Sequence, residues 1–165
     1  MQQKIMPASL RQLDIIAELA WKVWPDTYGE ILSEQQLHYM LHRFYAQSHL
    51  AERMSAGSRF YIYYKNDEPI GFCEYQHDVR AGWTKLHKLY VLPQKQGGGA
   101  GVALIGLVKE AAMAAEQLGV FLNVNRANKA RYFYERQGFV IVKEEDIDIG
   151  EGFYMNDFVM EWKND

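Results

Sequence analysis

Four of the five residues from 97 to 101 are glycines, and they lie between Pro93 and an apolar helical repeat. Glycine lets the backbone turn sharply and lets a ligand approach without a Cβ in the way. The first turn of the following helix offers unpaired N–H groups at the positive end of the helix dipole. A strand end, a glycine loop and a helix start therefore predict a phosphate-binding site. A flexible loop without a ligand is the alternative.

Two common phosphate loops do not fit this segment. A Walker loop carries Gly-Lys-Ser/Thr after its glycines, whereas Val102 and Ala103 follow Gly101 here. A dinucleotide fingerprint follows the first strand of a parallel sheet and has an acid about 20 residues further on. This loop comes mid-chain, and the strand after it ends in Asn-Val-Asn. Neither a P-loop nor a Rossmann site is predicted.

A second group of residues could receive a cation. Trp24, Asp26, Tyr28 and Glu30 lie close together around Pro25. Ring faces and carboxylates both attract positive charge, so this segment could bind a cationic substrate. A corner between two helices that packs Trp24 into the core is the alternative.

Two histidines and one cysteine could bind metal, but the sequence shows no complete set of ligands for a metal site. His38 and His42 have the spacing that places two imidazoles on one helix face. No glutamate follows His38, and no third ligand is evident, so a solvated helix face is expected and no metal is predicted. Cys73 is expected to be a small core residue.

Alternating helices and strands must position these groups. Capping boxes at Ser9 and Ser33 begin two of the expected helices, and Pro25 is expected to end the first. Asn66-Asp67-Glu68 is expected to form a hairpin turn. Apolar periodicity predicts helices over about 10–24, 48–56, 102–118 and 129–137, and a further helix after Ser33 whose apolar stripe is Leu37, Met40, Leu41 and Phe44. It predicts strands over 2–6, 59–65, 69–77, 84–92, 120–125, 139–144 and 153–162.

The element order β-αα(α)-βββ-α-β-α-ββ predicts an α/β (α+β) fold with a mostly antiparallel mixed sheet of about seven strands. Strand 84–92, helix 102–118 and strand 120–125 form one βαβ unit, so these two strands are expected to be parallel. No repeat or linker interrupts the pattern, and residues 1–165 are interpreted as a single domain.

The composition excludes several classes of protein. The 165 residues include 18 Lys and Arg against 21 Asp and Glu, a net charge of −3, which gives no basic excess for nucleic acid or an anionic membrane. The longest apolar runs are shorter than the ~18 to 20 residues of a membrane span. The single cysteine excludes an intrachain disulfide, and the N-terminus lacks the apolar core of a signal peptide. A cytoplasmic protein is expected.

Two motifs together resemble the GNAT superfamily of acyl-CoA-dependent N-acyltransferases. The pattern Gln96-x-x-Gly99-x-Gly101, after a Val-x-Pro strand end, is similar to that family's pyrophosphate-binding signature. The family's second cofactor segment is similar to a stretch about 30 residues further on: Leu122-Asn123-Val124-Asn125, Asn128-x-Ala130 and Phe133-Tyr134-x-x-x-Gly138-Phe139. The expected element order matches the family fold over nearly the whole chain.

The resemblance implies a GNAT-like sheet whose central parallel pair splays apart, with acetyl-CoA bound between the two strands. The backbone groups of Leu89, Tyr90 and Val91 would pair with the pantetheine. The pyrophosphate would lie against the loop and helix start formed by Gln96, Gly97, Gly98, Gly99, Ala100, Gly101 and Val102. Asn128 resembles a family asparagine, although it stands six residues before Tyr134 rather than the usual seven. An N-cap for helix 129–137 is its alternative role.

The resemblance also implies catalytic roles. Tyr134 stands where the family often has the general acid that protonates the departing thiolate. The family commonly has a glutamate base on the strand before the loop, but this chain has Lys85-Leu86-His87-Lys88 there. His87 is the candidate base because its native pKa is suitable. Glu74 is its rival, and backbone carbonyls with water are a further alternative.

On the acceptor side, the segment around Trp24 and the C-terminal Tyr154–Met160 resemble the branch that includes PaiA-type polyamine acetyltransferases. Residues Trp24, Tyr28, Glu30 and Glu74 are predicted substrate contacts, and the acids from Glu144 to Asp148 are expected to border the same side. The expected function is acetyl transfer to a small-molecule amine such as a polyamine, by a monomer or homodimer. The alternatives are a non-catalytic acyl-CoA-binding regulator and an enzyme that acts on a peptide or protein amine.

Overall fold

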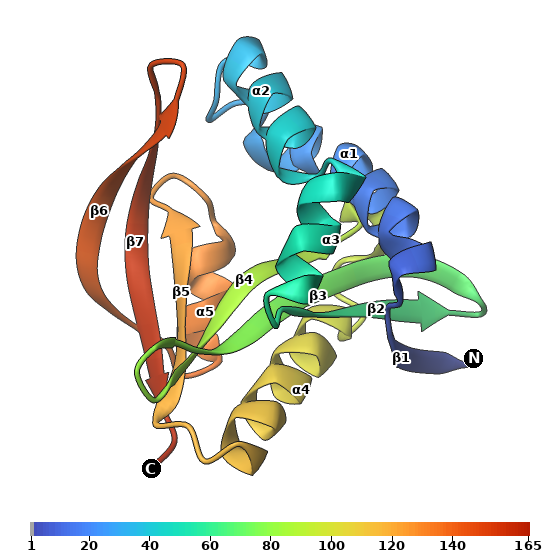
Figure 1. Ribbon diagram of the computed structural model, residues 1–165, viewed down its shortest axis with the longest axis vertical. Coiled ribbons are helices and arrows are strands. Elements are labelled where there is room, and N and C mark those ends of the chain that lie inside the picture. Colours follow the sequence, from blue (N-terminus) through green and yellow to red (C-terminus); the bar gives the residue numbers. More distant parts are fainter. Residues whose placement is uncertain (1) are drawn as a thin grey trace.

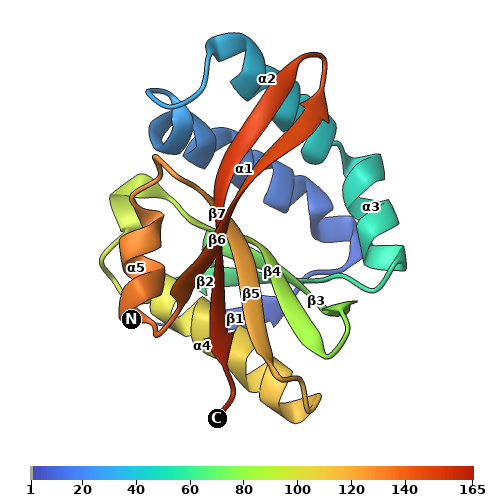
Figure 2. The same ribbon diagram turned by 90° about the vertical axis from the view of Figure 1, so that its left-hand side faces the viewer.

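The computed structural model describes residues 2–165, which form a seven-stranded sheet with helices on both faces (Figures 1 and 2). The strand order is β1-β2-β3-β4-β5-β7-β6, and every neighbouring pair is antiparallel except β4–β5. The α/β fold with a mostly antiparallel sheet and one parallel pair is thus confirmed. The strands are β1 (Gln3–Pro7), β2 (Arg59–Lys65), β3 (Glu68–Arg80), β4 (Trp83–Val91), β5 (Gly119–Asn125), β6 (Val140–Gly150) and β7 (Phe153–Lys163).

The helices form two layers around this sheet (Figures 1 and 2). The first three cover one face, and the last two pack on the other face. They are α1 (Leu13–Tyr28), α2 (Glu34–Phe44), α3 (Gln47–Ser55), α4 (Ala100–Ala114) and α5 (Ala130–Arg136), with short 3-10 turns at Leu10–Gln12 and Pro93–Lys95. No helix within residues 2–165 has the length and apolar character to cross a membrane.

Strands β4 and β5 pair over only part of their lengths. Trp83–Leu86 is in register with Gly119–Leu122, and beyond Leu86 the two strands form no bridges to each other. They diverge from this point, as Figure 1 shows. A register shift between Glu74 and Tyr75 of β3 leaves His87 of β4 without an opposite residue. Such a bulge bends a strand, and this one lies where β4 parts from β5.

The first helix runs further than expected. Pro25 was predicted to end it, but α1 continues through Pro25 to Tyr28, so that prediction was wrong. Proline removes one backbone donor, which costs the helix one hydrogen bond. Trp24 and Tyr28 lie four residues apart on the same face, both are buried, and their ring centroids are 4.6 Å apart. The burial of these two rings offsets the backbone hydrogen bond lost at Pro25. The helix therefore continues to Tyr28, which lies against the sheet.

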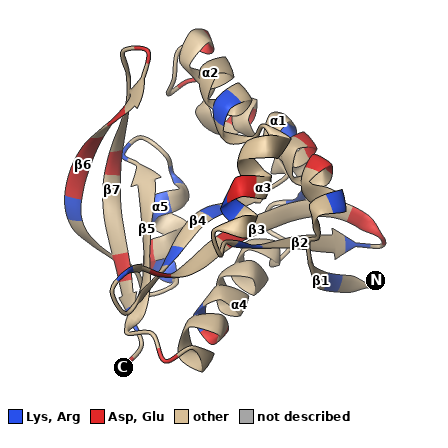
Figure 3. Cartoon of the chain, viewed as in Figure 1, with Lys and Arg blue, Asp and Glu red and all other residues tan. Residues whose placement is uncertain are grey.

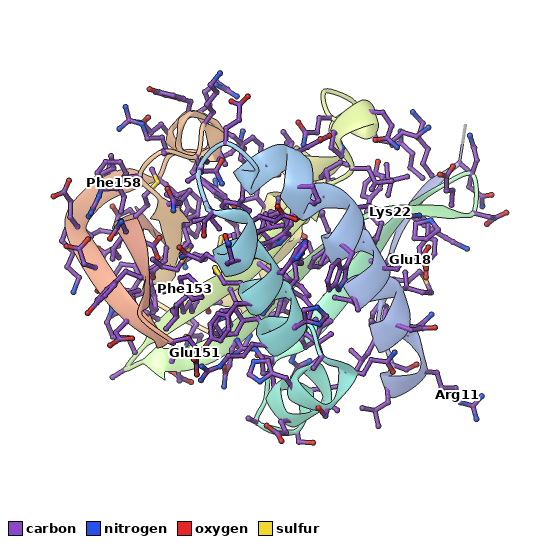
Figure 4. All side chains as sticks on the ribbon, turned by 90° about the horizontal axis from the view of Figure 1, so that it is seen from above. Arg11, Glu18, Lys22, Glu151, Phe153 and Phe158 are labelled. Atoms are coloured by element: carbon purple, nitrogen blue, oxygen red, sulfur yellow. The ribbon has the colours of Figure 1, made fainter. Side chains whose placement is uncertain are left out.

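The last two strands are also longer than expected and form a hairpin that reaches the helical layer. The acidic run Glu144–Asp148 was predicted to follow a strand end, but it lies inside β6. At the hairpin tip the Tyr39 hydroxyl of α2 donates to the Ile149 carbonyl at 2.6 Å. Phe153 of β7 packs on the Tyr39 ring at 5.3 Å, on the side of the molecule seen in Figure 4. The hairpin therefore closes one end of the space between β5 and α2.

Several local signals were confirmed. The Ser33 hydroxyl accepts from the Gln36 N–H at 3.1 Å and caps α2, and the Ser9 N–H donates to Gln12 at the start of the first helical turn. Asn66 and Asp67 both have positive φ angles, which a tight hairpin turn requires. Cys73 is fully buried in the core as expected.

Candidate functional site

A cleft of about 920 Å³ opens where β4 and β5 diverge. Backbone N–H and C=O groups on the facing edges of the two strands have no strand partner there, so an extended ligand could pair with them. The cleft walls come from β4, β5, the end of α1, the glycine loop and α5. Among the predicted cofactor contacts, those that line it are Leu89, Tyr90, Val91, Gln96, Gly97, Gly99, Ala100, Gly101, Val102 and Asn128. Gly98 does not line it.

The glycine loop presents a helix start to the cleft. Gly97 and Gly99 have φ angles of 87° and 88°, a conformation that favours glycine. Gly99 is the N-cap of α4, and no side chain caps the helix. The first intrahelical bond runs from the Ala103 N–H to the Gly99 carbonyl. The N–H groups of residues 100–102 are therefore open to an anion at the positive end of the helix dipole.

Two side chains hold this loop in place. The Gln96 amide donates to the Val91 carbonyl at 3.1 Å, which ties the loop to the end of β4. A Cβ on Gly101 would lie 3.3 Å from the Phe133 ring, so α4 begins in close contact with α5. Glycine at 101 thus serves helix packing, whereas glycine at 97 and 99 serves backbone conformation.

Tyr134 projects from α5 into the cleft. It is buried, its ring packs against Phe133 and Phe139, and the described part of the chain offers its hydroxyl no hydrogen bond. Burial raises the pKa of Tyr134 above its ordinary value. The hydroxyl therefore stays protonated at neutral pH and has a proton to donate.

Asn128 caps the start of α5 and lines the cleft as well. Its side-chain carbonyl accepts from the Ala130 N–H at 2.9 Å, which agrees with the capping alternative. The cap uses the oxygen of the amide.

His87 also lines the cleft, but its electrostatics do not suit a base. Its Nε2 lies 3.2 Å from Gln76 Oε1, so this nitrogen carries the proton. Burial lowers the pKa of His87 to about 3, despite the opposing charge of Glu74. An unperturbed imidazole would titrate near neutral pH, whereas burial removes that property from His87. A base this weak is poorly matched to proton removal near neutral pH.

The structure does not bring Glu74 to the cleft. Its side chain is completely buried behind Lys88, which donates to Oε1 at 2.6 Å, while Arg53 donates to Oε2 at 2.6 Å. Burial raises the pKa of Glu74, but Lys88, His87 and Arg53 outweigh burial and bring it below its usual value. Glu74 is thus an ion-paired core carboxylate, and its predicted role as base or substrate contact needs correction.

The predicted aromatic contacts separate into two groups. Tyr28 lines the cleft, and its hydroxyl lies 2.9 Å from that of Tyr90 on β4. Trp24 is buried behind them, with its ring 6.0 Å from Tyr90, and does not line the cleft. Glu30 and Asp26 are exposed at the cleft rim. The core alternative therefore holds for Trp24, and the ligand-facing prediction fits the position of Tyr28 and Glu30.

The acidic run, coloured red on β6 in Figure 3, alternates between the two faces of the hairpin. Glu145 is in register with Asp157 of β7, whereas its neighbour Glu144 is in register with Phe158. Successive side chains on a strand point to opposite faces, so Glu145 shares a face with Asp157 and Glu144 does not. Asp146 is paired with Arg126 at 2.5 Å. Within the run, Glu145 is therefore the acid that is in register with Asp157 and shares its face.

His38 and His42 do share a helix face, but both pack against the Trp21 ring, at 6.1 and 5.0 Å. Within residues 2–165, no three His, Cys, Asp or Glu side chains come together in a way that could hold a metal ion.

A family model described as "Acetyltransferase (GNAT) domain" matches residues 30–158 of this chain. The chain belongs to the GNAT acetyltransferase family. The PaiA N-acetyltransferase from Thermoplasma acidophilum, solved in complex with coenzyme A, is similar over 99% of both chains, with a TM-score of 0.82 and 26% identity. A GCN5-related N-acetyltransferase from Rhodopseudomonas palustris has the same fold, with a TM-score of 0.83, 18% identity, and coverage of 99% of this chain and 96% of that one.

An uncharacterized N-acetyltransferase from Mycobacterium tuberculosis is 39% identical over 78 residues, which are 47% of this chain and 49% of that relative. The chain thus spans about half the length of the curated relatives that it matches.

One feature of this GNAT site was noted in the sequence only as part of the Tyr154–Met160 pattern. Asp157 is buried on β7, beside Asn123 of the cleft wall. In the sequence it is one of two acids in an alternating strand. Only the strand pairing of β5, β7 and β6 shows that it shares a face with Asn125 and Glu145.

Proposed function

We propose that this protein transfers an acetyl group from acetyl-CoA to a primary amine. The observation that carries the proposal is the conjunction of two features in one GNAT cleft. Strands β4 and β5 diverge and leave unpaired backbone groups, and the uncapped start of α4 lies at the end of the same cleft.

The residues present fit coenzyme A. The open N–H groups of residues 100–102 suit a pyrophosphate, and the diverging edges at Leu89–Val91 suit the amides of a pantetheine arm. The cleft of about 920 Å³ is within the range of ligand sites. When bound, acetyl-CoA would supply a thioester whose carbonyl carbon is open to attack by an amine.

Tyr134 would provide the proton for the departing sulfur. Its hydroxyl lies in the cleft, lacks a partner in the described part of the chain, and is protonated at neutral pH because burial raises its pKa. The amine nitrogen would form its bond to the carbonyl carbon as the carbon–sulfur bond breaks. The amine would lose one proton to water in the cleft, and Tyr134 would donate one to the sulfur and regain a proton from water.

The acceptor proposed is a small cationic amine such as a polyamine. Exposed Asp26 and Glu30 lie at the cleft rim, and Glu145 and Asp157 share a face of the β6–β7 hairpin. These carboxylates would attract a polycation and hold its remote ammonium groups. Tyr28 would add a ring face to the alkyl stem.

The test of activity is release of free thiol from acetyl-CoA with a panel of spermidine, spermine, neutral amines, amino acids and an N-terminal peptide. We expect spermidine or spermine to have the highest kcat/KM. A panel in which a peptide or neutral amino acid exceeds every polyamine would contradict the substrate and leave acetyl transfer intact. No thiol release with any amine, together with thermal stabilisation by CoA, would favour the non-catalytic acyl-CoA-binding regulator.

The CoA site has its own test. Gly99→Glu would place a carboxylate at the start of α4, where the anion is expected, and should abolish stabilisation by CoA. Gly99→Ala is the matched control, because it carries the same backbone strain at φ 88° without the charge. Equal CoA-dependent shifts in melting temperature for Gly99→Glu and wild type would show that the phosphate site lies elsewhere.

A further inference from the structure

Asp157 is a carboxylate inside the protein that the chain itself leaves incompletely bonded. It is only 5% exposed. Its Oδ2 accepts one long hydrogen bond, 3.4 Å from the Asn123 amide, and its Oδ1 is buried without any hydrogen bond. Buried carboxylates are normally paired with cations or fully hydrogen-bonded.

The neighbouring cations in the described part of the chain do not pair with this carboxylate. Arg126 donates to the backbone carbonyl of Asp157 at 3.3 Å, and its guanidinium pairs with Asp146. Lys85 of β4 lies on the same face but forms no ion pair, and its Nζ lies 5.7 Å from the centre of the Phe121 ring. A cation or hydrogen-bond donor that pairs with the Asp157 carboxylate would therefore have to come from outside residues 2–165.

The position of Asp157 shows from which side that group would come. Asn123, its hydrogen-bond partner, lines the cleft between β4 and β5. Asn125, its register partner on β5, and Asn156, the preceding residue on β7, line a second hollow of about 340 Å³. Asp157 itself lines neither hollow, but it adjoins residues that line each of them. A molecule that extends from one into the other would pass the carboxylate.

We infer that Asp157 is the carboxylate that binds a remote ammonium group of the acceptor polyamine, which replaces the Asn123 amide at Oδ2 and leaves the reacting amine free to lose its proton. This assignment rests on the proposed acetyl transfer and names the residue that selects its substrate. An ammonium offers three N–H donors, so it can satisfy a carboxylate that has one weak bond. The class of ligand is a cationic primary amine.

The electrostatics of the site agree with this role. Burial raises the pKa of Asp157 to about 6, against the lowering effects of Asn123, Lys85 and Arg126, while Glu145 raises it. Tyr28 faces the group from α1. The carboxylate is thus charged at neutral pH but incompletely stabilised. An ammonium would restore the missing favourable interaction, and the attraction is strong because the site is shielded from water.

The test measures the KM for spermidine at saturating acetyl-CoA. Asp157→Asn keeps the shape of the side chain and removes its charge, and should raise the amine KM about 10-fold or more. The shift in melting temperature produced by CoA should not change. Glu144→Gln is the matched control, since it removes one charge from the opposite face of the same hairpin, and it should keep the wild-type KM.

The pH dependence gives a test that needs no variant. The wild-type amine KM should be steady from about pH 7 to 6.5 and rise as the pH falls below about 6, where Asp157 takes up a proton. In Asp157→Asn this rise should be absent. If the wild-type enzyme releases thiol and Asp157→Asn has the same amine KM as wild type, the role of Asp157 is overturned. It is also overturned if the wild-type amine KM does not rise below pH 6. Absence of thiol release in the wild type would instead overturn the proposed acetyl transfer.

Discussion

Glu74 and Asp157 are both buried carboxylates in the same sheet, and they differ in what surrounds them. Glu74 has two cations at 2.6 Å, Lys88 and Arg53. Asp157 has no ion pair within the described residues, and one of its oxygens has no partner. The pKa of Glu74 lies below its usual value, whereas that of Asp157 is raised to about 6. The difference teaches that a buried carboxylate stabilises the fold when the chain supplies its cationic partners. It is available to a ligand when the chain supplies none.

The largest effect is expected at Glu74. Glu74→Gln would leave Lys88 and Arg53 as buried cations without a counter-charge, and should lower the free energy of unfolding by about 3–5 kcal/mol. Urea denaturation measures this loss. Glu68→Gln, an exposed carboxylate on the same strand, should change stability little. If Glu74→Gln were as stable as wild type and raised the amine KM, Glu74 and not Asp157 would be the acceptor carboxylate.

A variant at Tyr134 tests proton donation separately from recognition of the charged amine. Tyr134→Phe removes the hydroxyl in the cleft and should lower kcat by ~10²-fold or more, because general acids contribute about 10²–10⁴-fold. Steady-state kinetics with spermidine should show an amine KM close to wild type, in contrast to Asp157→Asn. Tyr132→Phe is the control, because Tyr132 is exposed on the same helix. An unchanged kcat, with chemistry shown to be rate-limiting, would assign the proton to water.

Asp157→Asn is expected to make the folded protein more stable. A carboxyl whose pKa is raised on folding destabilises the native state when it is ionised, at pH values above about 6. The substitution should therefore raise the free energy of unfolding by about 1–3 kcal/mol at pH 7. The gain should shrink as the pH falls through about 6 and disappear only at about pH 3, below the usual aspartate pKa, where the wild-type carboxyl is protonated in both states. If Asp157→Asn were less stable than wild type at pH 7, the folded chain would already stabilise the ionised carboxylate of Asp157.

The residues predicted to contact the cofactor line the cleft more consistently than those predicted to contact the acceptor. The glycine loop is a local signal, because glycine is the residue type that readily adopts the φ angles near 88° found at Gly97 and Gly99. The cap at Ser33 and the turn at Asn66 were predicted for the same reason. Pro25 was misleading because the burial of Trp24 and Tyr28, which no local pattern reports, keeps α1 intact.

The two carboxylates could not be told apart in the sequence. Each is one acid in an alternating strand, and the sequence favoured Glu74 because it adjoins the strand that carries His87. Whether a carboxylate is paired depends on side chains from other elements. Arg53 comes from α3 to Glu74, whereas Arg126, which could have reached the Asp157 carboxylate, pairs with Asp146. The bulge that changes the setting of His87 is likewise a property of strand register.

The smallest effect is expected from salt, and it distinguishes the buried acid from the exposed ones. Asp26 and Glu30 are exposed at the cleft rim, so raising NaCl from about 0.05 to 0.5 M should screen them and raise the amine KM by about 2- to 4-fold. Asp157 is shielded from the solvent, and ions screen buried charges much less. The ratio of the amine KM in Asp157→Asn to that in wild type should therefore stay nearly constant across this range. A ratio that fell toward one at high salt would show that Asp157 attracts the amine only through solvent, as the rim acids do, and does not bind its ammonium directly.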